Sequence, residues 1–268
     1  MSTVFSFALG TGTQNKKGEW LEVFYPAPMI NVAAGIVDAA RKITGYSEGN
    51  QAIAVSKEQM LGLAEAFKAI NETALATTAK QLGASTQPLV VTILADDIKP
   101  GSTPEAYLKL HLLSHRLVKP HGIKLDGIFG LLPNVAWTNE GAIDISELPE
   151  RQLNARLQGK IIEVMSVDKF PKMTNYVVPS GVRIAHTARV RLGAYLGEGT
   201  TIMHEGFVNF NAGTEGPGMI EGRISAGVFV QAGSDLGGGC STMGTLSGGN
   251  NIIISIGKEC LIGANAGV

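Results

Sequence analysis

From Val178 onward, an aliphatic residue returns at every sixth position. The series comprises Val178, Ile184, Val190, Leu196, Ile202 and Val208, then Ile224, Val230 and Leu236, then Ile256, Ile262 and Val268. Four positions after most of these stands a small residue: Val182, Ala188, Ala194, Thr200, Gly206, Ala212, Ser234, Cys240, Cys260 or Ala266. A helix repeats near 3.6 residues and a strand near 2, so neither explains a period of six. The period predicts a left-handed parallel β-helix, in which three hexapeptides close one triangular coil.

Stacked coils bring parallel strands about 4.8 Å apart, so that equivalent positions of each hexapeptide lie above one another. The aliphatic positions then form one continuous buried ladder inside the prism. Chance apolar runs would lose the phase within two or three periods, whereas this series holds it in three blocks.

The chain before the repeats predicts a separate α/β domain. We therefore expect an α+β N-terminal domain over residues 1–168, a linker over 169–177, and an all-β domain of hexapeptide repeats over 178–268. Val268 is the first residue of a new hexapeptide. Because an open final coil exposes a sheet edge, we expect this domain to be truncated at its C-terminal end.

Local signals place several elements in the N-terminal domain. Val4 to Leu9 and Trp20 to Tyr25 flank a polar turn and predict a hairpin. Ser56 and Gln59 form a capping box that opens a helix, and we expect Gly83 to end it. Buried strands are expected at 89–95 and 161–167, and Thr103 with Pro104 predicts the start of a helix that runs to about residue 117. The stretch 127–148 gives no clear assignment.

Charge and composition exclude some classes of function. The chain has 22 basic and 23 acidic residues and a pI near 6.5, so it lacks the positive charge expected of a nucleic-acid or anionic-membrane binder. It has no apolar stretch of membrane-spanning length and no secretory leader pattern after Met1. These features predict a cytoplasmic protein. Cys240 and Cys260 fall in the small position of the repeat and are expected to be reduced core residues.

The repeat is interrupted twice, at 209–223 and at 237–251, and we expect both segments to be loops. A coil flank is flat, so loops are the available way to build the walls of a site, although both could simply be flexible. The second loop is rich in glycine and exposes backbone N–H groups that can hold a phosphate or an oxyanion. It lacks the lysine and spacing of a P-loop, so nucleotide hydrolysis is not indicated.

Long motifs also carry a family resemblance. The runs MHEGFVNFNAGTEGPGMIEGRISAGV, GSDLGGGCSTMGTLSGG and IGKECLIGANAG, with EAYLKLHLLSHRLVKPH, LLPNVAWTN and SVDKFPKMTNYVVPSGVRIA upstream, resemble tetrahydrodipicolinate N-succinyltransferases of pseudomonads and actinobacteria. The resemblance covers essentially the whole chain. It implies a homotrimer that transfers succinyl from succinyl-CoA to an amino-dicarboxylate in lysine biosynthesis.

The resemblance also assigns roles to residues. Glu221 of the MIEGR motif matches the family's catalytic carboxylate, which either attacks the thioester or takes the proton of the amine. Gly244 matches a glycine whose N–H suits the thioester oxyanion. The positions that contact succinyl-CoA in the family match Arg223, Gly238, Ser241 and Ala264.

The resemblance also implies a magnesium ion on the trimer axis. Glu205 matches one of its acidic ligands, but Ala188 stands at the other and cannot bind a metal. An axial Mg²⁺ would therefore rest on three copies of Glu205 and water.

Histidines offer rival chemistry. His204 precedes Glu205 and could be the general base that other hexapeptide acyltransferases use, and His186, one coil earlier, should stack on it. A zinc hydratase would need a third histidine in the coils, which the sequence lacks. His111 and His115 share one face of a predicted helix and are expected to be packing or surface residues.

Three arginines and three phenylalanines complete the candidates. Arg183, Arg189 and Arg191 could bind substrate carboxylates, or could merely be charged residues on the flanks of the prism. Phe207, Phe210 and Phe229 are expected on the outer faces, where they favour a trimer. Two other classes stay open: a passive trimeric scaffold, which would not bind CoA, and a nucleotide-sugar acyltransferase, for which residues 1–100 show no glycine-rich fingerprint.

Overall fold

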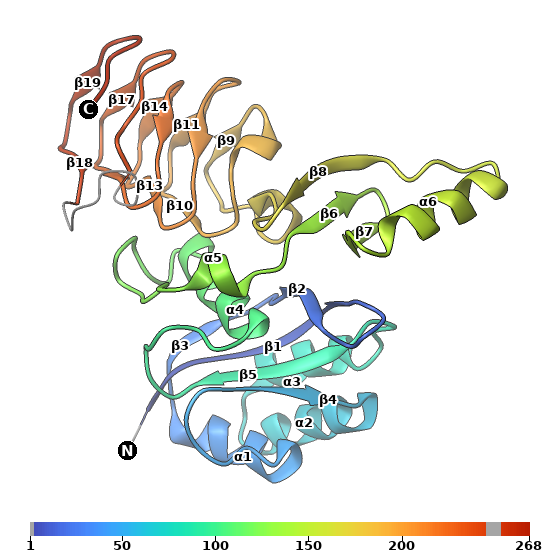
Figure 1. Ribbon diagram of the computed structural model, residues 1–268. Coiled ribbons are helices and arrows are strands. Elements are labelled where there is room, and N and C mark those ends of the chain that lie inside the picture. The colour runs from blue at the N-terminus through green and yellow to red at the C-terminus, as the bar shows by residue number, and fades with distance from the viewer. Residues whose placement is uncertain (1–2, 245–252) are drawn as a thin grey trace. The chain divides into compact units, whose positions relative to one another are not determined.

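The structure is a computed structural model that describes residues 3–244 and 253–268. It divides into two compact units, one formed by residues 1–108 and 124–169 and the other by 109–123 and 170–268 (Figure 1). The change near residue 169 lies close to the end expected for the N-terminal domain. The assignment of 109–123 to the second unit was not foreseen.

The main sheet of the first unit has the strand order β2-β1-β5-β4, with β3 also paired to β1. These strands are β1 (Val4–Gln14), β2 (Trp20–Phe24), β3 (Met29–Val32), β4 (Gln51–Val55) and β5 (Leu89–Leu94), and every pair is antiparallel. The hairpin of β1 and β2 and the fully buried strand β5 confirm the sequence predictions.

Three helices cover one face of this sheet: α1 (Ala34–Thr44), α2 (Lys57–Ala69) and α3 (Thr73–Leu82) (Figure 1). Strand alternation sends Val91 and Ile93 into their core, together with Leu63 and Phe67 of α2. On the other face, the Thr92 hydroxyl donates a 2.7 Å hydrogen bond to the Tyr25 hydroxyl, which donates to the Pro104 carbonyl. Both faces of β5 are thereby buried.

The capping box of Ser56 and Gln59 is present at the start of α2. The expected single helix to Gly83 is wrong, because Asn71 takes a left-handed conformation with φ 64° and splits it into α2 and α3. Gly83 follows the second helix instead. Apolar residues keep helical spacing on both sides of the break, so their pattern did not show it.

The first unit also holds a smaller sheet of order β7-β6-β8. Its elements are β6 (Val135–Thr138), β7 (Gly141–Asp144), α6 (Leu148–Leu157) and β8 (Val164–Asp168), and α5 (Ile128–Leu131) precedes them. The expected buried strand at 161–167 is therefore shorter and shifted, and its burial was wrong because Met165 and Val167 are half exposed.

Helix α4 (Thr103–Ser114) ends three residues before the predicted end, and Arg116 beyond it has a left-handed φ of 62°. Its Ser102 oxygen, one residue before the predicted cap, accepts a long 3.4 Å bond from the Glu105 N–H. The end of α4 and the residues after it run along the coils. Ser114 donates to the carbonyl of Ala194, for example, and Lys119 pairs with Glu215 at 2.9 Å.

The second unit is the predicted left-handed coil of parallel strands (Figure 1). One face stacks β9 (Arg183–Ile184), β11 (Thr200–Ile202), β14 (Gly218–Ile220), β17 (Asp235–Leu236) and β19 (Leu261–Ile262). A second stacks β10 (Ala194–Leu196), β13 (Ala212–Thr214), β16 (Phe229–Val230) and β18 (Ser255–Ile256). The third holds β12 (Phe207–Val208) and β15 (Arg223–Ile224), extended by bridges at Val190, Ser241 and Gly267. Short 3-10 turns lie at Met173–Asn175 and Thr187–Arg189.

The expected loop at 209–223 is wrong, because β13 and β14 of the regular coil occupy it. Thr214 takes the inward position, with 2 % of its surface exposed, and its hydroxyl bonds that of Thr200 at 2.7 Å. Ile220 fills the next inward position completely buried. The repeat therefore continues through the polar Thr214, which a search for aliphatic residues alone does not recognise as an inward position.

The repeat has two real departures in length. Ile202 pairs with Ile220, 18 residues later, whereas Val208 pairs with Ile224, 16 residues later, so two residues are missing between Ile220 and Ile224. Arg223 pairs with Ser241 at the full 18, whereas Val230 pairs with Ile256, 26 residues later. The insertion therefore follows Ser241. Most of it, residues 245–252 of the predicted glycine-rich loop, lies outside the described residues.

Candidate active site on the third face of the coil

The third face presents outward side chains immediately before each inward residue of the ladder. In successive coils these residues are Phe207, Arg223, Ser241 and Gly267, and backbone pairing aligns the four. Arg223 donates from Nη2 to the Ser241 hydroxyl at 2.9 Å. Two residues that the resemblance assigned to succinyl-CoA therefore lie in direct contact on adjacent coils.

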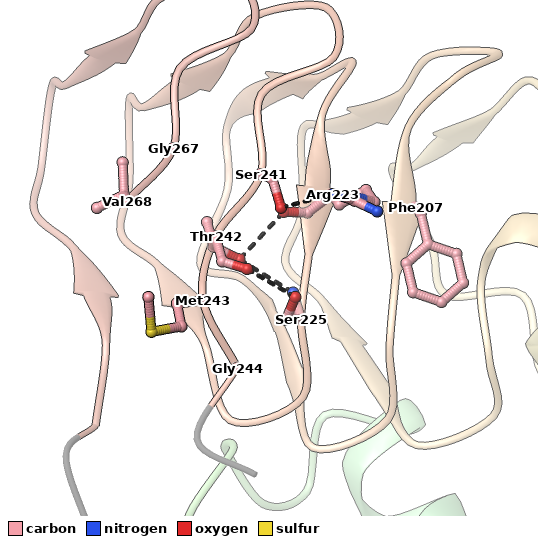
Figure 2. A pocket seen from close by; sticks show the side chains of 9 residues that line it. All are labelled: Phe207, Arg223, Ser225, Ser241, Thr242, Met243, Gly244, Gly267 and Val268. Carbon is pink, nitrogen blue, oxygen red and sulfur yellow. Dashed lines mark hydrogen bonds between the residues drawn. The ribbon is translucent and has the colours of Figure 1, made fainter. Parts of the chain in front are cut away.

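A pocket of about 560 Å³ opens beside this column. Its lining comprises Phe207, Arg223, Ser225, Ser241, Thr242, Met243, Gly244, Gly267 and Val268 (Figure 2). Three of the predicted site residues, Arg223, Ser241 and Gly244, are thus brought to one cavity. The lining offers an arginine and three hydroxyls together with Phe207 and Met243, a combination that suits an acyl chain carrying a carboxylate.

Glu221 stands at the corner where the two residues are missing. Only Glu221 and Gly222 link β14 to β15, whereas four residues, 203–206, make the same corner one coil earlier. The corner leaves no space for a side chain at position 222. A Cβ on Gly222 would lie 2.3 Å from the Cys240 Sγ and 2.6 Å from the Cys240 carbonyl oxygen. The buried Cys240 therefore leaves room only for glycine beside Glu221.

The short corner brings Glu221 against Gly238 of the next coil. A Cβ built on Gly238 would lie only 3.3 Å from the Glu221 Oε2. The Glu221 side chain is exposed, and among residues 3–244 and 253–268 its carboxylate has no hydrogen-bond or ion-pair partner. Such a carboxylate is free to act as a base or a nucleophile.

Ala264 belongs to the same corner, one coil further on. Its backbone nitrogen would lie 2.8 Å from a Cβ on Gly237, and the Asn265 N–H donates to the Gly238 carbonyl at 3.0 Å. Gly238 is therefore close to Glu221, Ala264 lies against Gly237 in the following coil, and neither lines the pocket.

A cluster of two stacked histidine rings, an arginine and a glutamate lies before Glu221 in the coil. His186 and His204 stack as predicted, with ring centroids 5.3 Å apart. Glu205 accepts 2.7 Å bonds from both His204 Nδ1 and Arg189 Nη2. The His204 hydrogen bond and then the Arg189 charge hold the pKa of Glu205 below its usual value.

Within one chain, this cluster does not form a site for a hard metal ion. Both Glu205 oxygens are engaged by His204 and Arg189, and Ala188 offers no oxygen from its side chain. In the described part of the chain, no three His, Cys, Asp or Glu side chains are grouped to hold a metal. His204 lies outside the lining of the pocket, as Glu221 also does, so the pocket lining does not decide between the two candidate bases.

The other two candidate arginines have different surroundings. Arg191 bonds Asn209 at 3.1 Å, and its guanidinium lies over the rings of Phe170 and Phe207 at 5.4 and 5.8 Å. Arg183 lines a second cavity of about 360 Å³ on the face of β9 and β11. Neither touches the pocket that holds Arg223.

Several remaining predictions need correction. Phe210 is buried and stacks on Phe170 at 4.3 Å, so it is not an outer apolar residue. His111 is completely buried and stacks on His115, whose Nε2 is buried without a hydrogen-bond partner in the described structure. The packing alternative holds for both. Cys240 is buried as expected, whereas Cys260 is only half-buried, and both are free thiols.

Sequence reasoning missed Ser225, Thr242 and Met243 as residues of the pocket. Thr242 falls six residues after Leu236, so continuing the hexapeptide count through the expected loop would have identified it as an inward position. Ser225 follows the inward Ile224 and carries no pattern of its own. Its place in the pocket lining follows only from the stacking of the coils.

Comparison with known proteins gives a consistent answer. Family models described as tetrahydrodipicolinate N-succinyltransferase N-terminal and middle match residues 50–130 and 132–172. The 2,3,4,5-tetrahydropyridine-2,6-dicarboxylate N-succinyltransferase of Pseudomonas paraeruginosa is 69 % identical over 266 residues, which cover 99 % of this chain and 77 % of that protein. The Vibrio cholerae protein of the same name is 58 % identical over 264 residues, 98 % of this chain and 77 % of its own length.

A solved structure agrees with these sequence matches. A putative 2,3,4,5-tetrahydropyridine-2-carboxylate N-succinyltransferase from Campylobacter jejuni superposes with a TM-score of 0.89 at 29 % identity, and the match covers 100 % of this chain and 79 % of that one. In the described residues, no helix has the length and apolar character needed to cross a membrane. The chain belongs to the tetrahydrodipicolinate N-succinyltransferase family.

Proposed function

We propose that this chain transfers the succinyl group of succinyl-CoA to the amino group of ring-opened tetrahydrodipicolinate. Family membership supports this reaction, and it is the succinylase step toward diaminopimelate and lysine. The observation that carries the site is the position of Glu221, an exposed carboxylate without a partner in the described residues, beside Gly238 and two residues from Arg223.

In the transfer, the amine nitrogen attacks the thioester carbonyl carbon. The carbon–sulfur bond breaks, an amide forms, and the proton lost by nitrogen passes to the Glu221 carboxylate and then to the CoA thiolate. As a nucleophile, Glu221 would instead form an acyl anhydride and release the thiolate before the amine attacks. Both routes require an ionised carboxylate. Rapid-quench detection of succinylated enzyme without acceptor separates them, since only the anhydride route gives it.

The developing charge on the thioester oxygen needs a donor, and we assign this role to the N–H of Gly244. Gly244 lines the pocket together with Arg223 and Ser241. Backbone N–H groups held in place before the reaction stabilise an oxyanion without reorganisation. Arg223 provides a cation for the distal carboxylate of the succinyl group, and Gly238 and Ala264 offer the backbone surface along which the cosubstrate extends.

We propose a homotrimer as the assembly. Outer side chains of the coil include three large apolar residues, Met219, Met243 and Leu261, which are 53, 56 and 76 % exposed. Triangular coils with apolar flanks are suited to threefold packing. Sedimentation at micromolar concentration should give three times the chain mass, and a stable monomer would contradict the proposal. A cytoplasmic location and an axial magnesium ion stay predictions, and no step above uses a metal.

A thiol-release assay tests the function. Succinyl-CoA with the ring-opened acceptor should release CoA at a saturable rate, and the rate should require Glu221. A passive scaffold would bind neither donor nor acceptor and would show no release above the uncatalysed rate. A nucleotide-sugar acyltransferase would accept a nucleotide-linked amino sugar in place of the dicarboxylate.

A further inference from the structure

The backbone ladder of the third face changes at one place. In earlier coils, the residue after each inward position donates its N–H to the carbonyl of the inward residue in the next coil. Arg191 donates in this way to Val208 at 3.1 Å, and Asn209 donates to Ile224 at 3.0 Å. By the same register, the N–H of Ser225 would donate to the carbonyl of Thr242.

Side-chain hydroxyls replace that bond. The Ser225 N–H donates to the Thr242 hydroxyl at 3.0 Å, and the Ser225 hydroxyl donates to the Thr242 carbonyl at 2.7 Å. The Thr242 hydroxyl in turn donates to the Arg223 carbonyl at 3.1 Å (Figure 2). We call these two residues, Ser225 and Thr242, the hydroxyl clamp.

Thr242 is an unexpected residue for its place in the coil. The inward positions before it on this face are Val190, Val208 and Ile224, all fully buried, and Thr242 is 2 % exposed. Burying a hydroxyl costs free energy unless it is hydrogen-bonded, so a valine of nearly the same shape would fill this position at lower cost. Packing alone therefore does not account for the threonine.

The clamp lies where the coil gains its insertion. Thr242 is the last inward residue before the departure in length, and Met243 and Gly244 follow it along the wall of the pocket. The Thr242 carbonyl belongs to the peptide unit whose N–H, on Met243, donates to the Val268 carbonyl. The Ser225 hydroxyl therefore holds one end of the peptide unit from which the chain leaves the coil. Gly244 is one residue further on.

We propose that Ser225 and Thr242 are positioning residues for acyl transfer, because their hydroxyl clamp sets the path of the backbone that carries Gly244. This inference rests on the proposed function, in which the Gly244 N–H meets the thioester oxygen. Misplacing a catalytic group by about 1 Å costs roughly 100-fold in rate, so a small change in this path is sufficient to be measured.

The test uses Thr242→Val and Ser225→Ala in the whole chain. Amide hydrogen exchange at Met243 and Gly244 should become faster in both variants, while the melting temperature stays near that of the wild type. The kcat for succinyl transfer should fall about 10- to 100-fold, with the acceptor KM unchanged. Thr242→Ser and Ser225→Thr keep the hydroxyls and should restore both properties.

Thr214→Val is the matched control. Thr214 is equally buried, and its hydroxyl bonds Thr200 on another face of the coil, away from the pocket. This variant should change neither the exchange at Gly244 nor kcat. Unchanged exchange at Met243 and Gly244 in Thr242→Val would overturn the clamp, and faster exchange with wild-type kcat would overturn its role in catalysis. A wild type without succinyl transfer would refute the proposed function, while the exchange measurements would still decide the clamp.

Discussion

Gly222→Ala tests whether the short corner positions Glu221. The new Cβ would lie 2.3 Å from the Cys240 Sγ and 2.6 Å from the Cys240 carbonyl oxygen. Comfortable contacts between heavy atoms are about 3.5 to 4.0 Å, so the corner must move by roughly 1 Å. The carbonyl is part of the coil and cannot rotate away, so the movement falls on Gly222 and its neighbour Glu221.

The magnitude follows from this displacement. Forcing an extra methyl into a packed site costs about 1 to 3 kcal/mol, and a chain of this size loses roughly 2 to 4 °C of melting temperature per kcal/mol. We therefore expect the melting temperature to fall by about 2 to 12 °C. The kcat should fall by about 100-fold, because the carboxylate is displaced from the reacting atoms by about 1 Å.

The assay is steady-state thiol release with succinyl-CoA, together with thermal unfolding. Gly257→Ala is the control, since its Cβ would lie 3.7 Å from the nearest atom, the Cys260 Sγ, and its backbone is not left-handed. This control should leave kcat and the melting temperature near those of the wild type, with free-energy changes of about a few tenths of a kcal/mol at most. A folded Gly222→Ala variant with kcat within threefold of the wild type would refute the positioning argument.

Three further predictions concern the chemistry and the pH dependence. Glu221→Gln should abolish turnover and leave CoA binding nearly intact, as measured by calorimetry, and His204→Asn should keep turnover; the reverse result would favour an imidazole base. Succinyl-CoA should exceed acetyl-CoA by about tenfold or more in kcat/KM, because its distal carboxylate gains a charged hydrogen bond worth about 1.5 to 3 kcal/mol, and equal rates would contradict the role of Arg223. Burial lowers the pKa of His115 below its usual value, so the unfolded chain binds the proton more readily. Stability should therefore be complete above the unfolded pKa near 6.5 and fall as the pH drops below it, and His115→Leu should weaken that dependence in melting curves between pH 5 and 8.

The coil was predictable from sequence because its core repeats. Each inward position meets the same neighbours in the coils above and below, so aliphatic residues recur with a fixed period. The pattern failed at Thr214, whose hydroxyl is satisfied by Thr200 rather than by apolar packing. A rule that counts only aliphatic side chains must treat such a residue as the end of the repeat.

The first unit was less predictable, for physical reasons that differ from place to place. The break at Asn71 depends on one left-handed residue inside a continuous apolar pattern. The edge strand β8 keeps β-branched and apolar residues although Met165 and Val167 are half exposed, so composition overestimated its burial. The docking of 109–123 with the coils depends on tertiary bonds, such as that of Ser114 to Ala194, which no local signal contains.

The candidate site combines both kinds of information. The family motifs predicted roles for Glu221, Arg223, Ser241 and Gly244, but only stacking shows that Arg223 contacts Ser241 and that the last three share a pocket. The motif could not show why Glu221 is followed by glycine. The structure supplies the reason, since Cys240 fills the space that a side chain at 222 would need.

Both departures from the 18-residue coil fall beside the proposed chemistry. A regular coil presents flat faces, on which equivalent residues are equally spaced and none is brought closer to the next coil. Removing two residues after Ile220 pulls the Glu221 corner against Gly238, and adding residues after Thr242 lets the backbone leave the face at Gly244. One change moves a carboxylate and the other redirects the backbone, at the two edges of the third face. The regular repeat therefore serves as the rigid support, and the two irregularities of length lie at the groups to which we assign the chemistry.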